Sequence, residues 1–304
     1  MNRRNVTVEV IGGLGNQLFC YAAGLNLSKK TSSPLILDMS LIGIGGTNHG
    51  RTLLNFNLGN VKIRNRVTKV RNFSFLKRLN NKIAISIPRY NQIRNNKSSV
   101  YLAKEIGFES AFAALEKPMY LKGYFQSYRY LESITVELTE MFKITNPSDW
   151  FESKLKLLEE LNPTIIHIRR GDYLKLQEDF GLLSKEYYLE AISRLDDYER
   201  EKPIWIFSDS PDIVLNEIVN SDLGNAEVII SPPEVTANEI LYLMSRGKRI
   251  VISNSTFSWW AAYFSQDHTK VFAPEFWFRD RKDPVDLIPP HWTKISNEWA
   301  THND

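Results

Sequence analysis

The second half of the chain alternates short apolar segments with helix-length segments, and this alternation restricts the fold more than any other feature. Strands are predicted at 164–168, 204–207, 227–230, 249–253 and 270–273, and helices at 184–199, 211–219, 236–246 and 257–265. Almost continuously apolar strands separated by helices are typical of a parallel sheet covered on both faces. We therefore expect a Rossmann-like α/β domain over residues 148–285.

The first half begins with a similar unit. A strand at 6–11 leads through the glycine turn 12–17 into a helix that ends near residue 30, and a second strand follows at 34–38. The unit resembles the start of a nucleotide-binding βαβ motif, although the dinucleotide fingerprint has a glycine where Leu18 stands. Because Asp38 occupies the position of a ribose-binding acid, a nicotinamide- or flavin-dependent oxidoreductase is an alternative function.

The remaining elements complete a two-domain organisation, as the length of 304 residues suggests. A strand is predicted at 120–125 and helices at 76–87, 128–142 and 148–161, the last with Ser148 as its N-cap. We expect one domain over residues 1–147 and the other over 148–285. The final segment, 286–304, contains Trp292 and Trp299 and is expected to pack back on the body.

Composition favours a protein of the cytoplasm. Hydrophobic residues make up 43% and charged residues 24% of the chain, which is ordinary for a globular protein. Cys20 is the single cysteine, so an intrachain disulfide is excluded and a reducing compartment is expected. The sequence has no uninterrupted run of the ~18 apolar residues that a spanning helix needs.

Positive charge is concentrated in one region. Between Met39 and Lys104 there is no Asp or Glu, whereas 13 Lys and Arg occur there. Such a block forms a solvated face or lies against an anionic surface. We expect peripheral contact with the inner face of the membrane through residues 51–104. A non-catalytic glycan- or nucleic-acid-binding module is a further alternative, but the block has no nucleic-acid recognition motif, and we expect no nucleic-acid partner.

Polar side chains follow three of the predicted strands of the second half. His167, Arg169, Arg170 and Asp172 surround the end of the first strand, Ser208 and Asp209 follow the next, and Asn254, Ser255, Thr256 and Phe257 follow strand 249–253. Each group alone has a structural explanation as a helix cap or an ion pair. Because the carboxyl ends of parallel strands meet at one edge, where ligands bind, the three groups together indicate a ligand cleft.

These residue types suit a nucleoside diphosphate. The planar fork of Arg169 can grip phosphate oxygens in a bidentate manner, and a helix beginning near Ser255 offers backbone amides to a second phosphate. A carboxylate at Asp209 would accept hydrogen bonds from N1 and N2 of guanine. Trp259 and Trp260 are expected to pack in the core.

Four segments, in this order, carry a resemblance to a known family. Gly12–Phe19, His167–Tyr173, Ser208–Asp209 and Ser253–Trp260 resemble the motifs of glycosyltransferase family eleven, the inverting α1,2-fucosyltransferases, particularly the bacterial ones. The resemblance implies a GT-B fold, in which two Rossmann-like domains face a cleft and the second holds the donor. It also implies GDP-L-fucose as donor and a terminal β-galactose on a glycan, in some settings lipid-linked, as acceptor.

The resemblance also implies roles for individual residues. Arg169 would contact the β-phosphate, His167 and Asp209 the guanine end, and Ser255, Thr256 and Phe257 the diphosphate. Asn16 would face the same cleft from the glycine turn. The complete expected donor site is Asn16, His167, Arg169, Asp172, Ser208, Asp209, Asn254, Ser255, Thr256 and Phe257.

The implied reaction is a single displacement in which the galactose O2 attacks and GDP leaves. The chain has no Asp-x-Asp pair, and its five histidines have no paired spacing, so we expect neither a metal nor a cofactor. Arg169 and the helix that begins near Asn254 would then stabilise the leaving diphosphate. If Arg170 forms an ion pair with a neighbouring acid, it is expected to tolerate substitution better than Arg169. Asp172 and Asp38 are both candidates for the general base.

Overall fold

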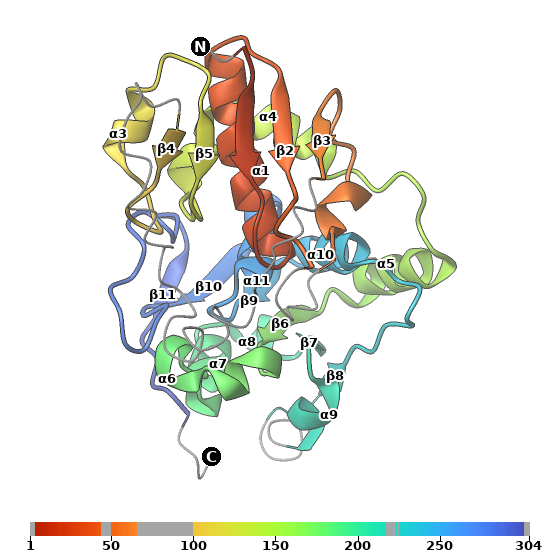
Figure 1. Ribbon diagram of the computed structural model, residues 1–304. Helices are drawn as coiled ribbons and strands as arrows, with labels where there is room; N and C mark the ends of the chain where they lie inside the picture. Colours follow the sequence, from red (N-terminus) through yellow and green to blue (C-terminus); the bar gives the residue numbers. More distant parts are fainter. Residues whose placement is uncertain (1–3, 44–49, 66–99, 217–222, 224, 301–304) are drawn as a thin grey trace.

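The computed structural model describes residues 4–43, 50–65, 100–216, 223 and 225–300. Within these ranges the chain forms two parallel sheets, one in each half of the sequence, which lie one above the other in Figure 1. The first sheet has the strand order β3-β2-β1-β5-β4 and the second has the order β11-β10-β9-β6-β7-β8. This is the two-domain α/β arrangement of the GT-B fold, so the predicted fold class is confirmed.

The first half surrounds β1 and α1. Its strands are β1 Val6–Glu9, β2 Leu35–Asp38, β3 Lys62–Arg64, β4 Val100–Leu102 and β5 Tyr120–Lys122. Its helices are α1 Leu14–Lys30, α3 Ser110–Ala113 and α4 Thr135–Met141, with 3-10 turns at Thr52–Asn55, Tyr128–Tyr130 and Glu132–Ile134. Strand β1 pairs with β2 on one side and β5 on the other. The glycine turn therefore leaves the sheet at its centre, and the chain enters α1 there.

The second half surrounds β6. Its strands are β6 Thr164–Ile168, β7 Ile204–Ser208, β8 Ala226–Val228, β9 Arg249–Val251, β10 Lys270–Pro274 and β11 Thr293–Ile295. Its helices are α5 Asp149–Leu161, α6 Gln177–Phe180, α7 Lys185–Ser193, α8 Asp197–Arg200, α9 Pro211–Val214, α10 Ala237–Ser245 and α11 Thr256–Tyr263, with a 3-10 turn at Gly171–Lys175. All five residues of β6 are buried, as expected for a central parallel strand covered on both faces.

The two halves meet where the start of α1 packs against α11. A Cβ atom on Gly15 would lie 2.4 Å from the backbone carbon of Thr256, so only glycine permits this approach. Trp260 Nε1 donates a hydrogen bond to the carbonyl oxygen of Gly15 at 2.9 Å. The ring of Phe19 lies 4.7 Å from Trp259 and 4.9 Å from Trp260. The prediction that the two tryptophans pack in the core is confirmed, since both are fully buried.

The C-terminal segment connects both halves. The carbonyl oxygen of Asp286 accepts hydrogen bonds from Ser127 Oγ at 2.7 Å and from the backbone N–H of Tyr128 at 3.1 Å. The chain then adds β11 to the edge of the second sheet, parallel to β10. Trp292 is buried beside Trp259, at 5.5 Å between ring centroids. The segment therefore contributes a strand to the second sheet and is also hydrogen-bonded to the first half.

Several predicted elements differ from the structure for local reasons. The single helix predicted at 184–199 is divided into α7 and α8, because Asp196 and Glu199 form a capping box that starts a new helix. The helix predicted at 128–142 is two 3-10 turns followed by α4. The strands β3, β4 and β11 were not predicted, since each has three residues and too little alternation to recognise. The N-cap at Ser148 is confirmed, because its hydroxyl accepts from the N–H of Phe151 at 3.2 Å.

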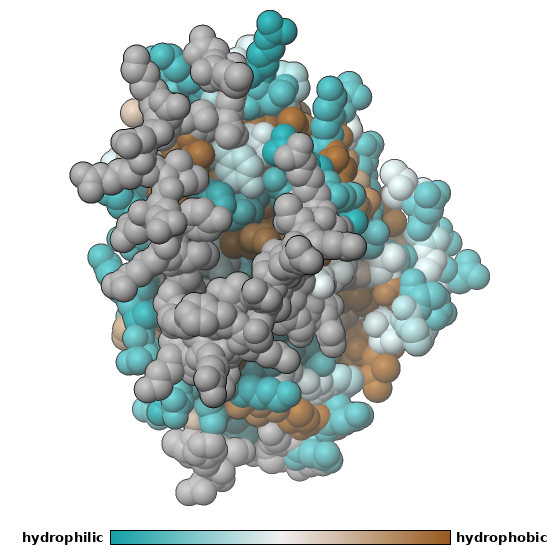
Figure 2. Space-filling view, viewed as in Figure 1, coloured by the Kyte–Doolittle hydropathy of each residue, from teal (hydrophilic) through white to brown (hydrophobic). Residues whose placement is uncertain are grey.

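The predicted helix at 76–87 and most of the basic segment 51–104 lie outside the described residues. The described surface that faces the viewer in Figure 2 is mainly hydrophilic, with smaller hydrophobic patches between polar residues. In the ranges that the structure describes, no helix is both long enough and apolar enough to cross a membrane.

Candidate functional site

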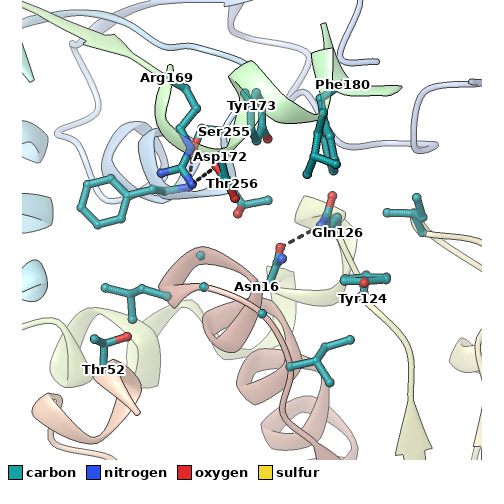
Figure 3. Close-up of a pocket in the computed structure, with 18 of the residues that line it drawn as sticks. Asn16, Thr52, Tyr124, Gln126, Arg169, Asp172, Tyr173, Phe180, Ser255 and Thr256 are labelled. Carbon is teal, nitrogen blue, oxygen red and sulfur yellow. Dashed lines mark hydrogen bonds and ion pairs between the residues drawn. The ribbon is translucent and has the colours of Figure 1, made fainter. Parts of the chain in front are cut away.

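A cavity of about 640 Å³ opens between the two halves and is lined by residues of both. Figure 3 shows its two opposing sides. We call the side built by the second half the arginine wall; it includes Arg169, Asp172, Ser255, Thr256 and Phe257. We call the opposite side the amide wall; it includes Gly12, Gly15, Asn16 and Gln126.

Arg169 directly follows β6, and its guanidinium is held by two carboxylates. Its Nη2 donates to Asp172 Oδ1 at 2.6 Å, and its Nη1 lies 3.0 Å from Asp209 Oδ2. Burial acts to lower the pKa of Arg169, but the nearby carboxylates of Asp209 and Asp172 outweigh it and raise the pKa above its ordinary value. The side chain is therefore a permanent cation with a fixed orientation at the cavity.

Asp209 lies behind Arg169 and does not itself line the cavity. Besides the ion pair with Arg169, its Oδ1 accepts from the backbone N–H of Arg170 at 2.9 Å. A Cβ atom on Gly171 would lie 2.0 Å from Asp209 Oδ2, so the glycine makes room for this carboxylate. Asp209 thus connects the end of β7 to the loop after β6. The predicted guanine contact stays a prediction.

The start of α11 forms the second part of the arginine wall. Ser255 is the N-cap of the helix, and its hydroxyl accepts from the N–H of Phe257 at 3.4 Å. Ser255, Thr256 and Phe257 all line the cavity. A helix N-terminus presents backbone N–H groups and the positive end of the helix dipole, and both favour an anion.

His167 is buried beneath the arginine wall and does not line the cavity. Its Nδ1 lies 2.8 Å from Ser253 Oγ, and its ring lies 5.7 Å from that of Phe257. Burial, and secondarily the charge of Arg169, lowers the pKa of His167 to about 3. The imidazole is therefore neutral and contributes packing and one hydrogen bond beneath Phe257.

Asn254 and Ser208 also lie outside the cavity lining. Asn254 Nδ2 donates to the carbonyl oxygens of Phe180 at 3.0 Å, Gly181 at 3.3 Å and Trp277 at 3.2 Å. The Asn254 amide therefore connects its own loop to two other segments, one of which includes the cavity-lining Phe180. Ser208 Oγ accepts from the N–H of Ser210 at 3.0 Å and so stabilises the turn after β7.

Arg170 differs from the sequence-based expectation. Its side chain is buried, and its Nη1 donates to the carbonyl oxygens of Leu183 at 3.3 Å and Arg169 at 3.4 Å. Its removal would leave buried carbonyl groups without these donors, so we expect substitution of Arg170 to cost stability. Its tolerance relative to Arg169 stays a prediction.

The amide wall begins with the glycine turn before α1. Gly12 has φ +71°, and a Cβ atom there would lie 2.6 Å from Asn16 Nδ2. Gln17 is fully buried; its Nε2 donates to the carbonyl oxygens of Gly12 and Gly50, each at 2.9 Å. The turn is thus fixed from below by Gln17, while Asn16 faces the cavity (Figure 3).

Gln126 completes the amide wall and was not predicted from sequence. It follows β5, and its Nε2 donates to Asn16 Oδ1 at 2.9 Å (Figure 3). The sequence did contain a signal for it. The strand Tyr120–Lys122 is followed directly by Gly123 and then by polar residues, and polar residues also follow the strands that carry the other site residues. Tyr124, Tyr173 and Phe180 are further lining residues that were not predicted.

Asp38, one of the two base candidates, is occupied elsewhere. It accepts from Ser40 Oγ at 2.5 Å and from the hydroxyl of Tyr120 at 3.1 Å, and it lies 3.6 Å from Arg64 Nη1. It does not line the described cavity. The other candidate, Asp172, does line the cavity but is paired with Arg169. Among the described residues, no group of three or more His, Cys, Asp or Glu is arranged to hold a metal ion.

The sequence matches the family model described as Glycosyl transferase family 11 over residues 3–296. It is 27% identical to the "Alpha-1,2-colitosyltransferase" of Escherichia coli, over 95% of this chain and 98% of that protein. It is 28% identical to the "O-antigen biosynthesis glycosyltransferase WbnK" of Escherichia coli, over 88% of this chain and 93% of that protein.

The chain is also similar to solved structures of glycosyltransferases. The fucosyltransferase NodZ from Bradyrhizobium aligns with a TM-score of 0.47 and 15% identity, over 87% of this chain and 94% of that one. The E. coli ADP-heptose lps heptosyltransferase II aligns with a TM-score of 0.47 and 12% identity, over 96% of this chain and 90% of that one.

Proposed function

The chain belongs to glycosyl transferase family 11, and from this premise we propose that it is an inverting galactoside α1,2-fucosyltransferase. It would transfer L-fucose from GDP-β-L-fucose to O2 of a terminal β-galactose on a glycan, without a metal ion. The observation that carries the proposal is that Arg169 and the N-terminus of α11 lie on the same wall of one cavity, where two contacts to a diphosphate can form together.

The arginine wall supports the donor half of this reaction. When the bond between the sugar and GDP breaks, negative charge grows on the β-phosphate, and a preorganised cation stabilises that charge without reorganising. Asp172 and Asp209 hold Arg169 in place before the substrate arrives. Ser255, Thr256 and Phe257 offer the helix N-terminus to the same diphosphate, while His167, Ser208 and Asn254 support these elements from behind.

The donor sugar is the finer part of the proposal. One relative is described as an α1,2-colitosyltransferase, so a GDP-colitose donor is the competing choice within the same reaction class. Colitose lacks the 3-hydroxyl of fucose. A site that hydrogen-bonds a substrate hydroxyl rejects an analogue that lacks it, so a fucosyltransferase should strongly prefer the fucosyl donor.

An assay of the purified protein tests the proposal. GDP-fucose and GDP-colitose are each offered with a β-galactoside, and the product linkage is determined by NMR. We expect an α1,2-linked fucoside, formed with inversion, in the presence of excess EDTA. If only colitose were transferred, the donor would be GDP-colitose and not GDP-fucose. Loss of activity in EDTA with recovery on adding manganese would contradict the metal-free mechanism.

We also propose that the protein acts in the cytoplasm, at the inner face of the membrane, where a lipid carrier could present the acceptor glycan. The motivation is the acid-free basic segment 51–104. Anionic lipids attract such clusters by about 1 kcal/mol per basic residue near the surface. Flotation with vesicles of zwitterionic lipid, with and without phosphatidylglycerol, tests this: binding that does not depend on the anionic lipid would contradict it.

A further inference from the structure

Gln126 is presented to the cavity by an unusual backbone. Phe125 has φ +53°, a left-handed conformation that is rare for a bulky side chain, and Gly123 has φ +153°. The turn is closed by a hydrogen bond from the N–H of Ser127 to the carbonyl oxygen of Phe125 at 2.9 Å. The N–H of Gln126 itself donates to the carbonyl oxygen of Ile106 at 2.8 Å. Backbone strain of this kind is concentrated at ligand sites, where it orients a side chain.

The side-chain amide of Gln126 has one end satisfied and the other unsatisfied. The residue is only 6% exposed, and its Nε2 donates to Asn16 Oδ1. Its Oε1 is buried and accepts no hydrogen bond from any described residue. Figure 3 shows this oxygen turned away from Asn16, towards the side of the cavity where the arginine wall lies. A buried carbonyl oxygen without a protein donor is costly, so this atom needs a hydrogen-bond donor from the cavity, either a water molecule or a substrate hydroxyl that displaces it.

The position of Gln126 indicates which substrate supplies that partner. In an inverting displacement the nucleophile approaches from the side opposite the leaving group. If the diphosphate lies on the arginine wall, the acceptor approaches from the amide wall. A carbonyl oxygen only accepts hydrogen bonds, so Gln126 Oε1 repels phosphate oxygens and suits a hydroxyl.

On the basis of the proposed function, we infer that Gln126 Oε1 accepts a hydrogen bond from a non-reacting hydroxyl of the acceptor galactose and so determines acceptor specificity. Asn16 is a positioning residue in this arrangement. By accepting from Gln126 Nε2, it fixes which end of the Gln126 amide faces the substrate. Gly12 is required behind it, since any side chain there would displace Asn16.

The test uses a series of β-galactosides that lack the 3-, 4- or 6-hydroxyl, each still able to react at O2. Wild type should discriminate against one member by about tenfold to hundredfold in kcat/KM, the range for leaving a buried polar group unpaired. Gln126→Met keeps the size of the side chain but removes the amide. With the full galactoside, the kcat/KM of this variant should fall by the same tenfold to hundredfold factor. The variant should then no longer distinguish the full galactoside from that deoxy analogue.

Gln126→Glu and Asn16→Asp are the matched controls. Gln126→Glu keeps an acceptor oxygen at this position, so it should retain the discrimination that Gln126→Met loses. Asn16→Asp keeps the oxygen that holds Gln126 Nε2 and should discriminate, whereas Asn16→Ala should not. All variants are also assayed for GDP affinity by calorimetry and for Tm.

The outcomes separate this inference from the proposed function. If wild type binds no GDP and transfers no sugar, the proposed function fails. The inference is overturned if wild type is active but has the same kcat/KM for all the deoxygalactosides and the full galactoside. It is also overturned if Gln126→Met discriminates between them as wild type does. An equal loss of GDP affinity and acceptor kcat/KM in Gln126→Met would also overturn it, by moving Gln126 to the donor site. If Gln126→Met does not fold, Gln126→Glu and Asn16→Ala decide with the same series.

Discussion

The two walls of the cavity are built by different chemistry. The arginine wall relies on charge: Arg169 lies between Asp172 and Asp209, beside the N-terminus of α11. The amide wall relies on neutral groups, Asn16 and Gln126, and on glycines that permit close packing. The difference matches the two halves of the proposed displacement, since a leaving diphosphate needs a fixed cation and an attacking glycan needs hydrogen bonds to neutral hydroxyls. Each wall can therefore be disturbed separately.

The largest effect is expected at the centre of the arginine wall. Arg169→Lys keeps a positive charge but loses the planar fork that contacts both carboxylates and a phosphate. Turnover should fall by about 10²–10³, the usual cost of one preorganised contact to developing charge, and Arg169→Ala should be no more than slightly worse. Steady-state kinetics with GDP-fucose measure both variants.

Arg170 is the matched control for Arg169. Its guanidinium is buried and donates to backbone carbonyls, so Arg170→Met should lower Tm more than Arg169→Lys does. If Arg170→Met keeps the wild-type Tm and loses turnover while Arg169→Lys stays active, the two arginines have been assigned the wrong roles.

The junction of the two walls should give the next largest effect. Gly15→Ala forces a Cβ atom to within 2.4 Å of the backbone of Thr256, and backbone cannot move aside as a flexible side chain can. Overpacking of this kind costs about 1–3 kcal/mol of the free energy of unfolding. Urea unfolding measures the loss. Gly50→Ala is the control, because the nearest atom to its Cβ would be 3.9 Å away; an equal loss in both variants would show that close packing at Gly15 is not the cause.

The arginine wall could largely be predicted from the sequence, whereas the amide wall could not. Arg169 and Ser255 follow strands of five and three residues that are buried throughout, and the polar residues after such strands indicate the ligand-binding edge of a sheet. Gln126 follows a strand of three residues whose partner β1 lies more than a hundred residues earlier. Its orientation depends on the positive φ of Phe125, which no local pattern predicts.

Side-chain contacts behind the arginine wall were equally hard to predict. The sequence predicted Asp209 as a donor-site residue but could not show that it lies behind Arg169, with its two oxygens occupied by Arg169 and the N–H of Arg170. Such contacts depend on how the loops after β6 and β7 approach each other. Gly171 permits that approach, because a Cβ atom there would lie 2.0 Å from Asp209 Oδ2.

Asp209→Asn distinguishes two roles within the arginine wall. Because the carboxylate holds Arg169, we expect its neutral replacement to lower the affinities for GDP and ADP by the same factor. This factor should be about tenfold, for the loss of one charge-assisted contact. Calorimetric titration of both nucleotides measures this. A selective loss of GDP binding, with ADP unchanged, would instead assign Asp209 to the guanine contact that the family resemblance implies.

The smallest predicted effect is the pH dependence of the free energy of unfolding that His167 causes near neutral pH. His167 lies beneath the arginine wall, and the Asn16–Gln126 pair of the amide wall has no group that titrates. The pKa of His167 is lowered from 6.5 to about 3 in the folded protein, so the unfolded chain binds a proton at a higher pH than the folded chain does. Stability from this residue is therefore complete above about pH 6.5 and is lost as the pH falls towards 3, by up to about 1.4 kcal/mol per pH unit. Between pH 7 and 6 the loss should be about 0.7 kcal/mol.

The variant His167→Gln tests this pH dependence. Its side chain can still form a hydrogen bond with Ser253 but does not titrate, so the difference in unfolding free energy between wild type and variant should shrink as the pH falls. A difference that is constant from pH 7 to 5 would mean that His167 takes up its proton in the folded protein over the same pH range as in the unfolded chain, and this would contradict the lowered pKa.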